Sequence, residues 1–160
     1  MICWVLAFYV PFGLLVLDGW LAHLLLEVPV LTLALCMFLA LQARASAVPG
    51  LLVCTALARS VLVGGDAALH VLTLGLPVAA LVPLRGVFFF GHLLWQAAAA
   101  AFLVLALPVA AALIARLVDD APPIAGVGGA QLACAILCVP PATWLLGALP
   151  PFSLLREVSE

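Results

Sequence analysis

The stretch Val87–Leu117 reads VFFFGHLLWQAAAAAFLVLALPVAAALIARL and decides the fold class. Its only strongly polar side chains are His92, Gln96 and Arg116, so a helix built from it has no polar face. A water-soluble domain of this size still exposes about a third of the surface of its unfolded chain. This stretch offers almost nothing suited to water, and we therefore predict that it crosses a membrane.

The rest of the chain has the same character. Of its 160 residues 69% are hydrophobic, and its five arginines and seven acidic residues, with no lysine, fall mostly between apolar runs. Spanning helices need roughly 20 apolar residues each, so the chain has room for about six. The sequence thus predicts an all-α membrane protein, a bundle of about six transmembrane helices forming a single polytopic domain over residues 1–160. The apolar runs are Ile2–Leu26, Val30–Gln42, Leu51–Val63, Ala67–Leu84, Leu93–Val118 and Ile124–Leu149.

Two of these runs are short for a spanning helix. At about 1.5 Å per residue, residues 30–42 and 51–63 rise much less than the ~30 Å of the hydrocarbon core. We expect thinning of the bilayer or burial among neighbouring helices to accommodate the second run. The pattern leaves open whether the two short runs cross fully.

The arginines predict the orientation. With six spans, the turns containing Arg44 and Arg85 and the tail containing Arg156 lie on one side. Three arginines against one on the other side place both termini in the cytoplasm by the positive-inside rule. An odd number of crossing helices would undo this prediction. The opposite side contains Glu27, Asp66, Arg116, Asp119 and Asp120.

Composition argues against several function classes. A net charge of −2 offers no basic surface to nucleic acid. The five cysteines lie in apolar segments, where they behave as small hydrophobic residues, and their odd number argues against a disulfide framework. No serine has a Gly-x-Ser-x-Gly setting, and neither a Ser/Lys pair nor a His-Glu-x-x-His cluster exists. We therefore expect no enzyme, no catalytic residue, no metal and no cofactor.

Charged groups within spans cost several kcal/mol near the bilayer centre and so indicate candidate sites. We expect Asp18 about 13 Å and Arg59 about 7 Å below the non-cytoplasmic surface. Two interpretations remain open: a ligand contact, partner contact or buried ion pair on one hand, or an Asp18 bound to a hydroxyl or water and an Arg59 that extends to the interface on the other. Asp66 and His70 share a helix face near the same surface and complete a candidate polar cluster.

A second candidate feature is a stripe of small residues at fourfold spacing. Gly126, Ala130, Cys134 and Cys138 share one face of the sixth run. Small residues let membrane helices approach closely, and the alanines at 97–101 offer a similar surface on the fifth run. We interpret the stripe as a helix-packing surface rather than as a reactive cysteine pair.

The middle of the chain contains a series of short motifs: Pro49-Gly50, Leu57-Ala-Arg-Ser60, Gly64-Gly-Asp-Ala-Ala-Leu-His-Val-Leu-Thr-Leu74, Arg85 and Phe88. In these motifs the chain resembles the rod-shape-determining protein D (MreD) family. The resemblance covers about half of the chain. One position departs from it, because many members have an acidic residue in the third helix where this chain has Arg59 and Ser60. Asp66 lies one helical turn beyond them.

The resemblance implies a non-enzymatic integral subunit of the bacterial inner membrane, in the cell-elongation (rod) complex that controls cell shape and peptidoglycan synthesis. Its implied partners are membrane lipids, an MreC-like membrane-anchored coiled-coil protein and cell-wall synthesis proteins. The family is also similar in fold to the substrate-binding subunits of energy-coupling-factor transporters, which implies an alternative: a vitamin-binding subunit of an importer. A scaffold needs exposed helix faces, whereas a binding subunit needs a pocket of a few hundred Å³ with convergent polar groups. The sparse polar side chains favour the scaffold.

Overall fold

The computed structural model describes residues 2–22, 28–86, 93–118, 127–149 and 152–155, and these parts of the chain are helical apart from short connections. The predicted all-α class is therefore confirmed. Six helices have 12 or more residues, and a 3-10 turn and a one-turn helix accompany them. The elements are α1 (Ile2–Ala22), α2 (Val30–Leu41), α3 (Val48–Val63), α4 (Ala67–Leu81), η1 (Val82–Gly86), α5 (Leu93–Val118), α6 (Gly129–Ala148) and α7 (Phe152–Leu155).

The helix boundaries differ from the predicted runs in several places, and two of these differences have a clear physical reason. The third helix begins at Val48, within the segment expected to be a turn, because Pro49 lies in its first turn, where a missing backbone N–H costs nothing. The fourth helix changes to 3-10 geometry at Val82, just before Pro83, instead of continuing to Leu84. The predicted starts and ends at residues 23–27 and 119–126 lie outside the described residues.

Three helical segments in the described residues are long and apolar enough to cross a membrane: Ala67–Arg85, Leu94–Leu117 and Gly129–Ala148. Much of their apolar surface faces outward, including Leu105 and Leu113 of α5 and Leu137 and Trp144 of α6. Large apolar surfaces of this kind are rare on soluble monomers. Length, composition and exposure together indicate a multi-pass membrane protein.

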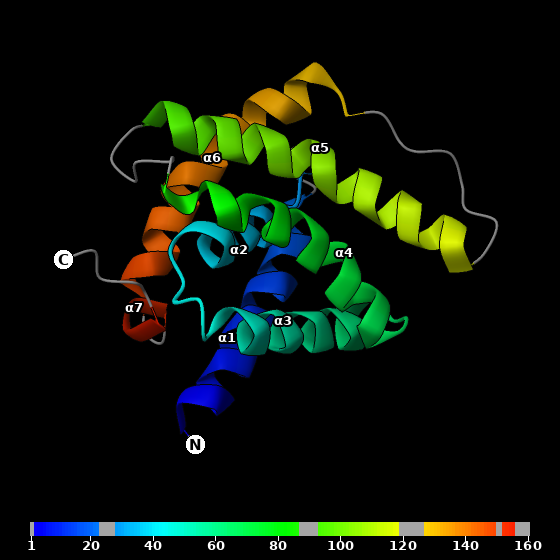
Figure 1. The fold of residues 1–160 in the computed structure, drawn as a ribbon, viewed down its shortest axis with the longest axis vertical. Coiled ribbons are helices and arrows are strands. Elements are labelled where there is room, and N and C mark those ends of the chain that lie inside the picture. Colours follow the sequence, from blue (N-terminus) through cyan, green and yellow to red (C-terminus); the bar gives the residue numbers. More distant parts are fainter. Residues whose placement is uncertain (1, 23–27, 87–92, 119–126, 150–151, 156–160) are drawn as a thin grey trace.

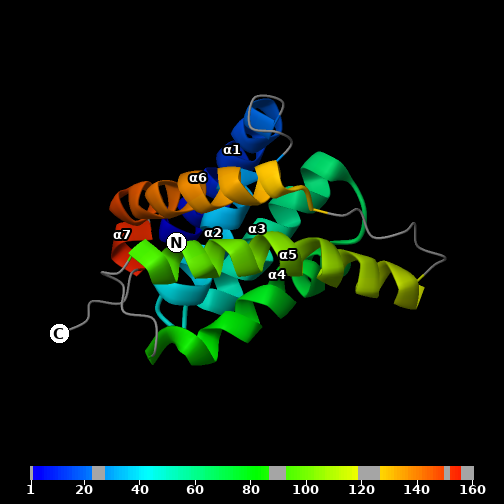
Figure 2. The ribbon, with the colours of Figure 1, turned by 90° about the horizontal axis from the view of Figure 1, so that it is seen from above.

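The short helix α2 lies at the centre of the bundle. Figure 1 shows it between α5 and α3, and Figure 2 shows α6 and α4 on its two other sides. It packs against each of the other five long helices, and all of its residues except Leu31 are buried. A helix that is apolar on every face needs such burial. Of the two accommodations expected for the second run, the structure shows burial among neighbours.

Candidate functional site

Asp18 on α1 binds the first turn of α2. Its Oδ1 accepts a hydrogen bond from the backbone N–H of Leu31 at 2.8 Å. Its Oδ2 accepts from the backbone N–H of Thr32 at 3.0 Å and also from the Thr32 hydroxyl. The carboxylate is 4% exposed, so one buried acidic side chain receives three donors from a neighbouring helix.

This contact completes the hydrogen bonding at the start of α2. Pro29 at the N-cap has no N–H, and no side chain within α2 caps the helix. The Val30 N–H donates to the carbonyl of Val28, and the Leu33 N–H donates to that of Pro29. Asp18 accepts from the two N–H groups between them, so each N–H of the first turn has an acceptor. A carboxylate here also interacts favourably with the positive end of the helix dipole.

Arg85 performs the matching role at the other end of α2. Its guanidinium lies in η1 and donates to the carbonyls of Leu39, at 2.7 Å, and Ala40. Last-turn carbonyls have no partner within their own helix, and a cation beside them complements the negative end of the dipole. The buried helix is thus held by an acidic side chain at one end and a basic side chain at the other.

Sequence reasoning treated Arg85 only as a marker of orientation and of the family resemblance. The apolar second run could have indicated this role, because an apolar helix needs groups from elsewhere to bond its ends. Carbonyls and N–H groups at the ends of a buried helix must be satisfied by another part of the protein when no water is present. The charged residues within or beside spans were the available partners.

Arg59 on α3 lies near Asp18 but is not bonded to it. Helices α1 and α3 pack against each other, and both residues line a cavity of about 170 Å³. Within the described part of the chain, however, no ion pair or hydrogen bond engages the Arg59 guanidinium. Of the two interpretations left open, the buried ion pair is therefore not formed among the described residues, and the Asp18 carboxylate is bonded to the start of α2.

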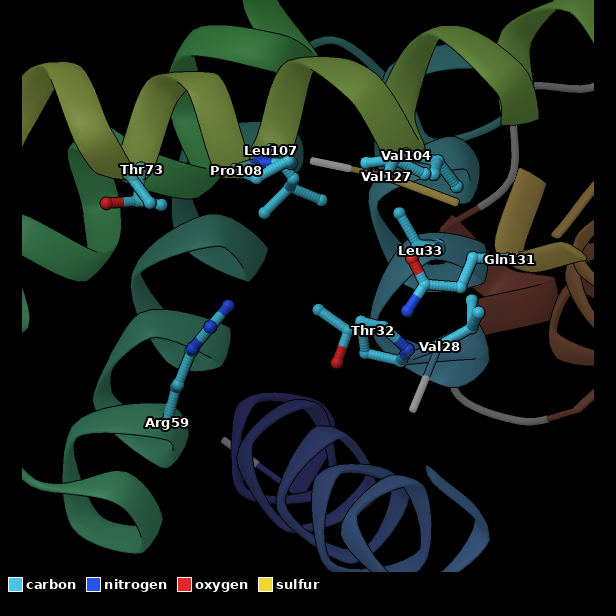
Figure 3. A pocket seen from close by; sticks show the side chains of 12 residues that line it. Val28, Thr32, Leu33, Arg59, Thr73, Val104, Leu107, Pro108, Val127 and Gln131 are labelled. Atoms are coloured by element: carbon cyan, nitrogen blue, oxygen red, sulfur yellow. The ribbon is translucent and has the colours of Figure 1, made fainter. Parts of the chain in front are cut away.

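The guanidinium of Arg59 extends into a larger cavity, shown in Figure 3. This cavity has a volume of about 300 Å³, and α2, α3, α4, α5 and α6 all contribute to its wall. Thr32, Thr73 and Gln131 are its other polar lining residues, and sequence reasoning did not identify any of the three. They escaped notice because uncharged polar side chains on separate helices have no common spacing. The residues that line the cavity are Val28, Pro29, Thr32, Leu33, Arg59, Thr73, Val104, Leu107, Pro108, Ala111, Val127 and Gln131.

Asp66 and His70 organise the turn between α3 and α4. The Asp66 carboxylate caps α4 by accepting from the Ala68 N–H at 3.0 Å, and the His70 Nε2 lies 2.9 Å from the Gly64 carbonyl oxygen. Gly64 and Gly65 have φ angles of 81° and 91°, which glycine adopts without strain. Both polar residues are thus engaged within the turn, and no hydrogen bond among the described residues joins them to Asp18 or Arg59.

The small-residue stripe lies partly at a packing surface. Cys134 and Cys138 are half-buried against the core, whereas Ala130 is exposed and Gly126 lies outside the described residues. Elsewhere on α6, Gly147 lies close to the end of α2: an added Cβ there would lie 2.7 Å from the Oε1 of Gln42, the residue that follows α2.

Metal ligands do not cluster in the described segments: no group of three His, Cys, Asp or Glu side chains there could hold an ion. The described residues form a bundle with one buried helix capped by charged side chains, and Arg59 lies in the walls of two cavities. No protein-family model, curated protein or solved structure matches this chain.

Proposed function

We propose that this chain is a non-enzymatic inner-membrane subunit of the bacterial cell-elongation complex, acting through protein contacts in cell-shape control and peptidoglycan synthesis. The resemblance to the MreD family supports the complex, and the surface of α1 supports the mode of action. The proposed partners are an MreC-like membrane-anchored coiled-coil protein and the cell-wall synthesis proteins.

The exposed face of α1 is the observation that supports a scaffold most directly. Helix α1 packs mainly against α2 and α3 at one side of the bundle. Its other face exposes large side chains, with Tyr9 at 65% and Trp20 at 71%. A shallow groove on this face is lined by Gly13, Val16, Leu17, Gly19 and Trp20.

This groove suits the transmembrane anchor of a partner. An added Cβ at Gly13 or Gly19 would meet no other atom within 4 Å, so the backbone of α1 is accessible there. Membrane helices associate through close backbone approach at small residues, and aromatic side chains beside them add contact area. We therefore assign the partner-binding surface, called the α1 groove below, to these five residues.

Site-specific photo-crosslinking tests the proposal. A photoreactive amino acid at Leu17, in the α1 groove, is expected to crosslink to a co-expressed MreC-like protein. The control position is Leu137 on α6, which is 73% exposed and lies outside the groove. Crosslinking at Leu17 alone supports the proposal. Equal crosslinking at both positions, or none at either in cells that contain the partner, contradicts it.

The cavity at Arg59 favours a second candidate, the vitamin-binding subunit of an energy-coupling-factor importer. Its volume of about 300 Å³ lies at the lower end of the range for small-molecule sites, and four polar residues line it. Affinity purification from the native membrane separates the two candidates. Recovery of coiled-coil and cell-wall synthesis proteins supports the scaffold, whereas recovery of ATP-binding-cassette subunits alone supports the importer.

A further inference from the structure

The larger cavity has a cation in a wall whose other described residues are uncharged. Among the described residues that line it, Arg59 is the only charged one. Figure 3 shows its side chain extending from α3 toward the space between Thr32 and Leu107. Eight of the lining residues are apolar, including Leu33 and Val104, both buried. A ligand that fits this cavity is therefore largely apolar and meets one positive charge.

The neighbouring acidic group does not neutralise this charge by direct contact. Asp18 receives its donors from α2, and within the described residues it forms no ion pair with Arg59. The Arg59 side chain is only partly buried, so solvent still reaches it. It presents a planar set of donors that matches a carboxylate or a phosphate, often through two parallel hydrogen bonds.

The two threonines in the wall do not compete for this role. The Thr32 hydroxyl donates its proton to Asp18, and the Thr73 hydroxyl donates to the Leu69 carbonyl at 2.8 Å. Each hydroxyl has one proton, so neither can donate to a ligand while these bonds exist. Among the described lining side chains, Arg59 and the amide of Gln131 remain as donors, and of these only Arg59 carries the positive charge that complements an anion.

We propose that this cavity binds an amphipathic anion, with a phosphate or carboxylate at Arg59 and an apolar body against Leu33, Val104 and Leu107. Either an anionic lipid or a soluble amphipathic molecule would present this chemistry. The inference depends on the cavity alone and holds whichever of the two proposed functions is correct.

Binding to the purified protein tests the inference without any partner. The protein, in an uncharged detergent, is titrated with octyl phosphate, and binding is followed by calorimetry and by the unfolding temperature. We expect saturable binding that Arg59→Gln weakens about tenfold to a hundredfold, since hydrogen bonds to charged groups contribute about 1.5–3 kcal/mol. The matched control is Arg116→Gln, which removes an exposed arginine outside the cavity and should leave binding unchanged.

A lipid arm identifies the source of the anion. The same variants are placed in nanodiscs of phosphatidylglycerol or of phosphatidylcholine, and retained lipid is counted by native mass spectrometry. Arg59-dependent retention of phosphatidylglycerol without binding of octyl phosphate indicates a lipid, and the reverse indicates a soluble ligand. Both results support the inference. No binding in either arm, or equal binding by the wild type and Arg59→Gln, overturns it.

A cavity-filling variant covers the case in which Arg59→Gln does not fold. Ala111 lies on α5 in the cavity wall and is exposed, so Ala111→Phe should be tolerated by the fold. Lost binding at an unchanged unfolding temperature supports the inference, and unchanged binding of both probes contradicts it.

Discussion

Asp18 and Arg59 line the same small cavity, yet their surroundings differ. Asp18 is 4% exposed and receives three hydrogen bonds from α2, whereas no hydrogen bond to Arg59 exists in the described segments. The first charge is part of the structure, because removing it would leave buried donors without an acceptor. The charge of Arg59 satisfies no buried hydrogen-bonding group among the described residues. A charge within an apolar helix is thus not by itself a functional residue, and its hydrogen bonds decide between the two roles.

The largest effect is expected for Asp18→Ala. The change leaves the N–H groups of Leu31 and Thr32 and one hydroxyl without an acceptor in an apolar interior. We expect a loss of at least about 3 kcal/mol in the free energy of unfolding. Denaturant titration in detergent micelles measures it. Asp66→Ala, which removes an exposed cap, is the control and should cost about 1 kcal/mol. Equal losses in the two variants would contradict the structural role of Asp18.

Arg85→Ala is expected to destabilise the protein by about 2 kcal/mol in the same titration. The effect is smaller than at Asp18 because a carbonyl without its partner costs less than an N–H. Arg85→Lys keeps the charge but not the two fixed donors, so it should recover only part of the loss. If Arg85→Ala had the same free energy of unfolding as the wild type, Arg85 would not stabilise the end of α2.

Gly147→Ala and Gly13→Ala form a matched pair within helices. An alanine at 147 brings its Cβ within 2.7 Å of Gln42, a buried side chain, whereas one at 13 meets nothing within 4 Å. We expect Gly147→Ala to lose about 1 kcal/mol through overpacking. Gly13→Ala should be neutral or stabilising, because alanine favours the helix. A lower unfolding temperature for Gly147→Ala than for Gly13→Ala would confirm the close approach of α6 to α2. The opposite order would contradict it.

The smallest effect on stability is expected for Arg59→Gln, within about 0.5 kcal/mol of the wild type. No hydrogen bond or ion pair among the described residues is lost by this change. A loss of about 3 kcal/mol in denaturant titration would instead indicate that Arg59 is paired structurally, which would remove the contrast with Asp18.

Helix positions could be predicted from the sequence because apolar runs and Pro/Gly turns determine them. The fifth run matches α5 at both ends, and the second run differs from α2 by one residue. Burial of the second run was one of two expected accommodations, since a helix that is apolar all round suits either lipid or a protein interior. The interpretation of Asp18 as a residue bound to a hydroxyl was also correct for one of its contacts, the bond from Thr32.

Contacts between distant segments could not be predicted. The hydrogen bonds from α2 to Asp18 and from Arg85 to α2 join residues 13 to 46 positions apart, and no local pattern specifies such pairs. The cavity at Arg59 likewise depends on how five helices pack. Spacing identifies which side chains share a face, but only tertiary packing determines which faces meet.

Helix α2 is a buried helix held at both ends by charged side chains from other elements. Hydrogen–deuterium exchange of peptides covering Val30–Leu41, measured by mass spectrometry in detergent, tests this claim most directly. We predict that α2 exchanges more slowly than α1, α3 or α6 in the wild type. In Asp18→Ala, exchange should accelerate first in the turn that begins at Val30. An α2 that exchanges as fast as α1, or an Asp18→Ala variant with unchanged exchange, would contradict the claim.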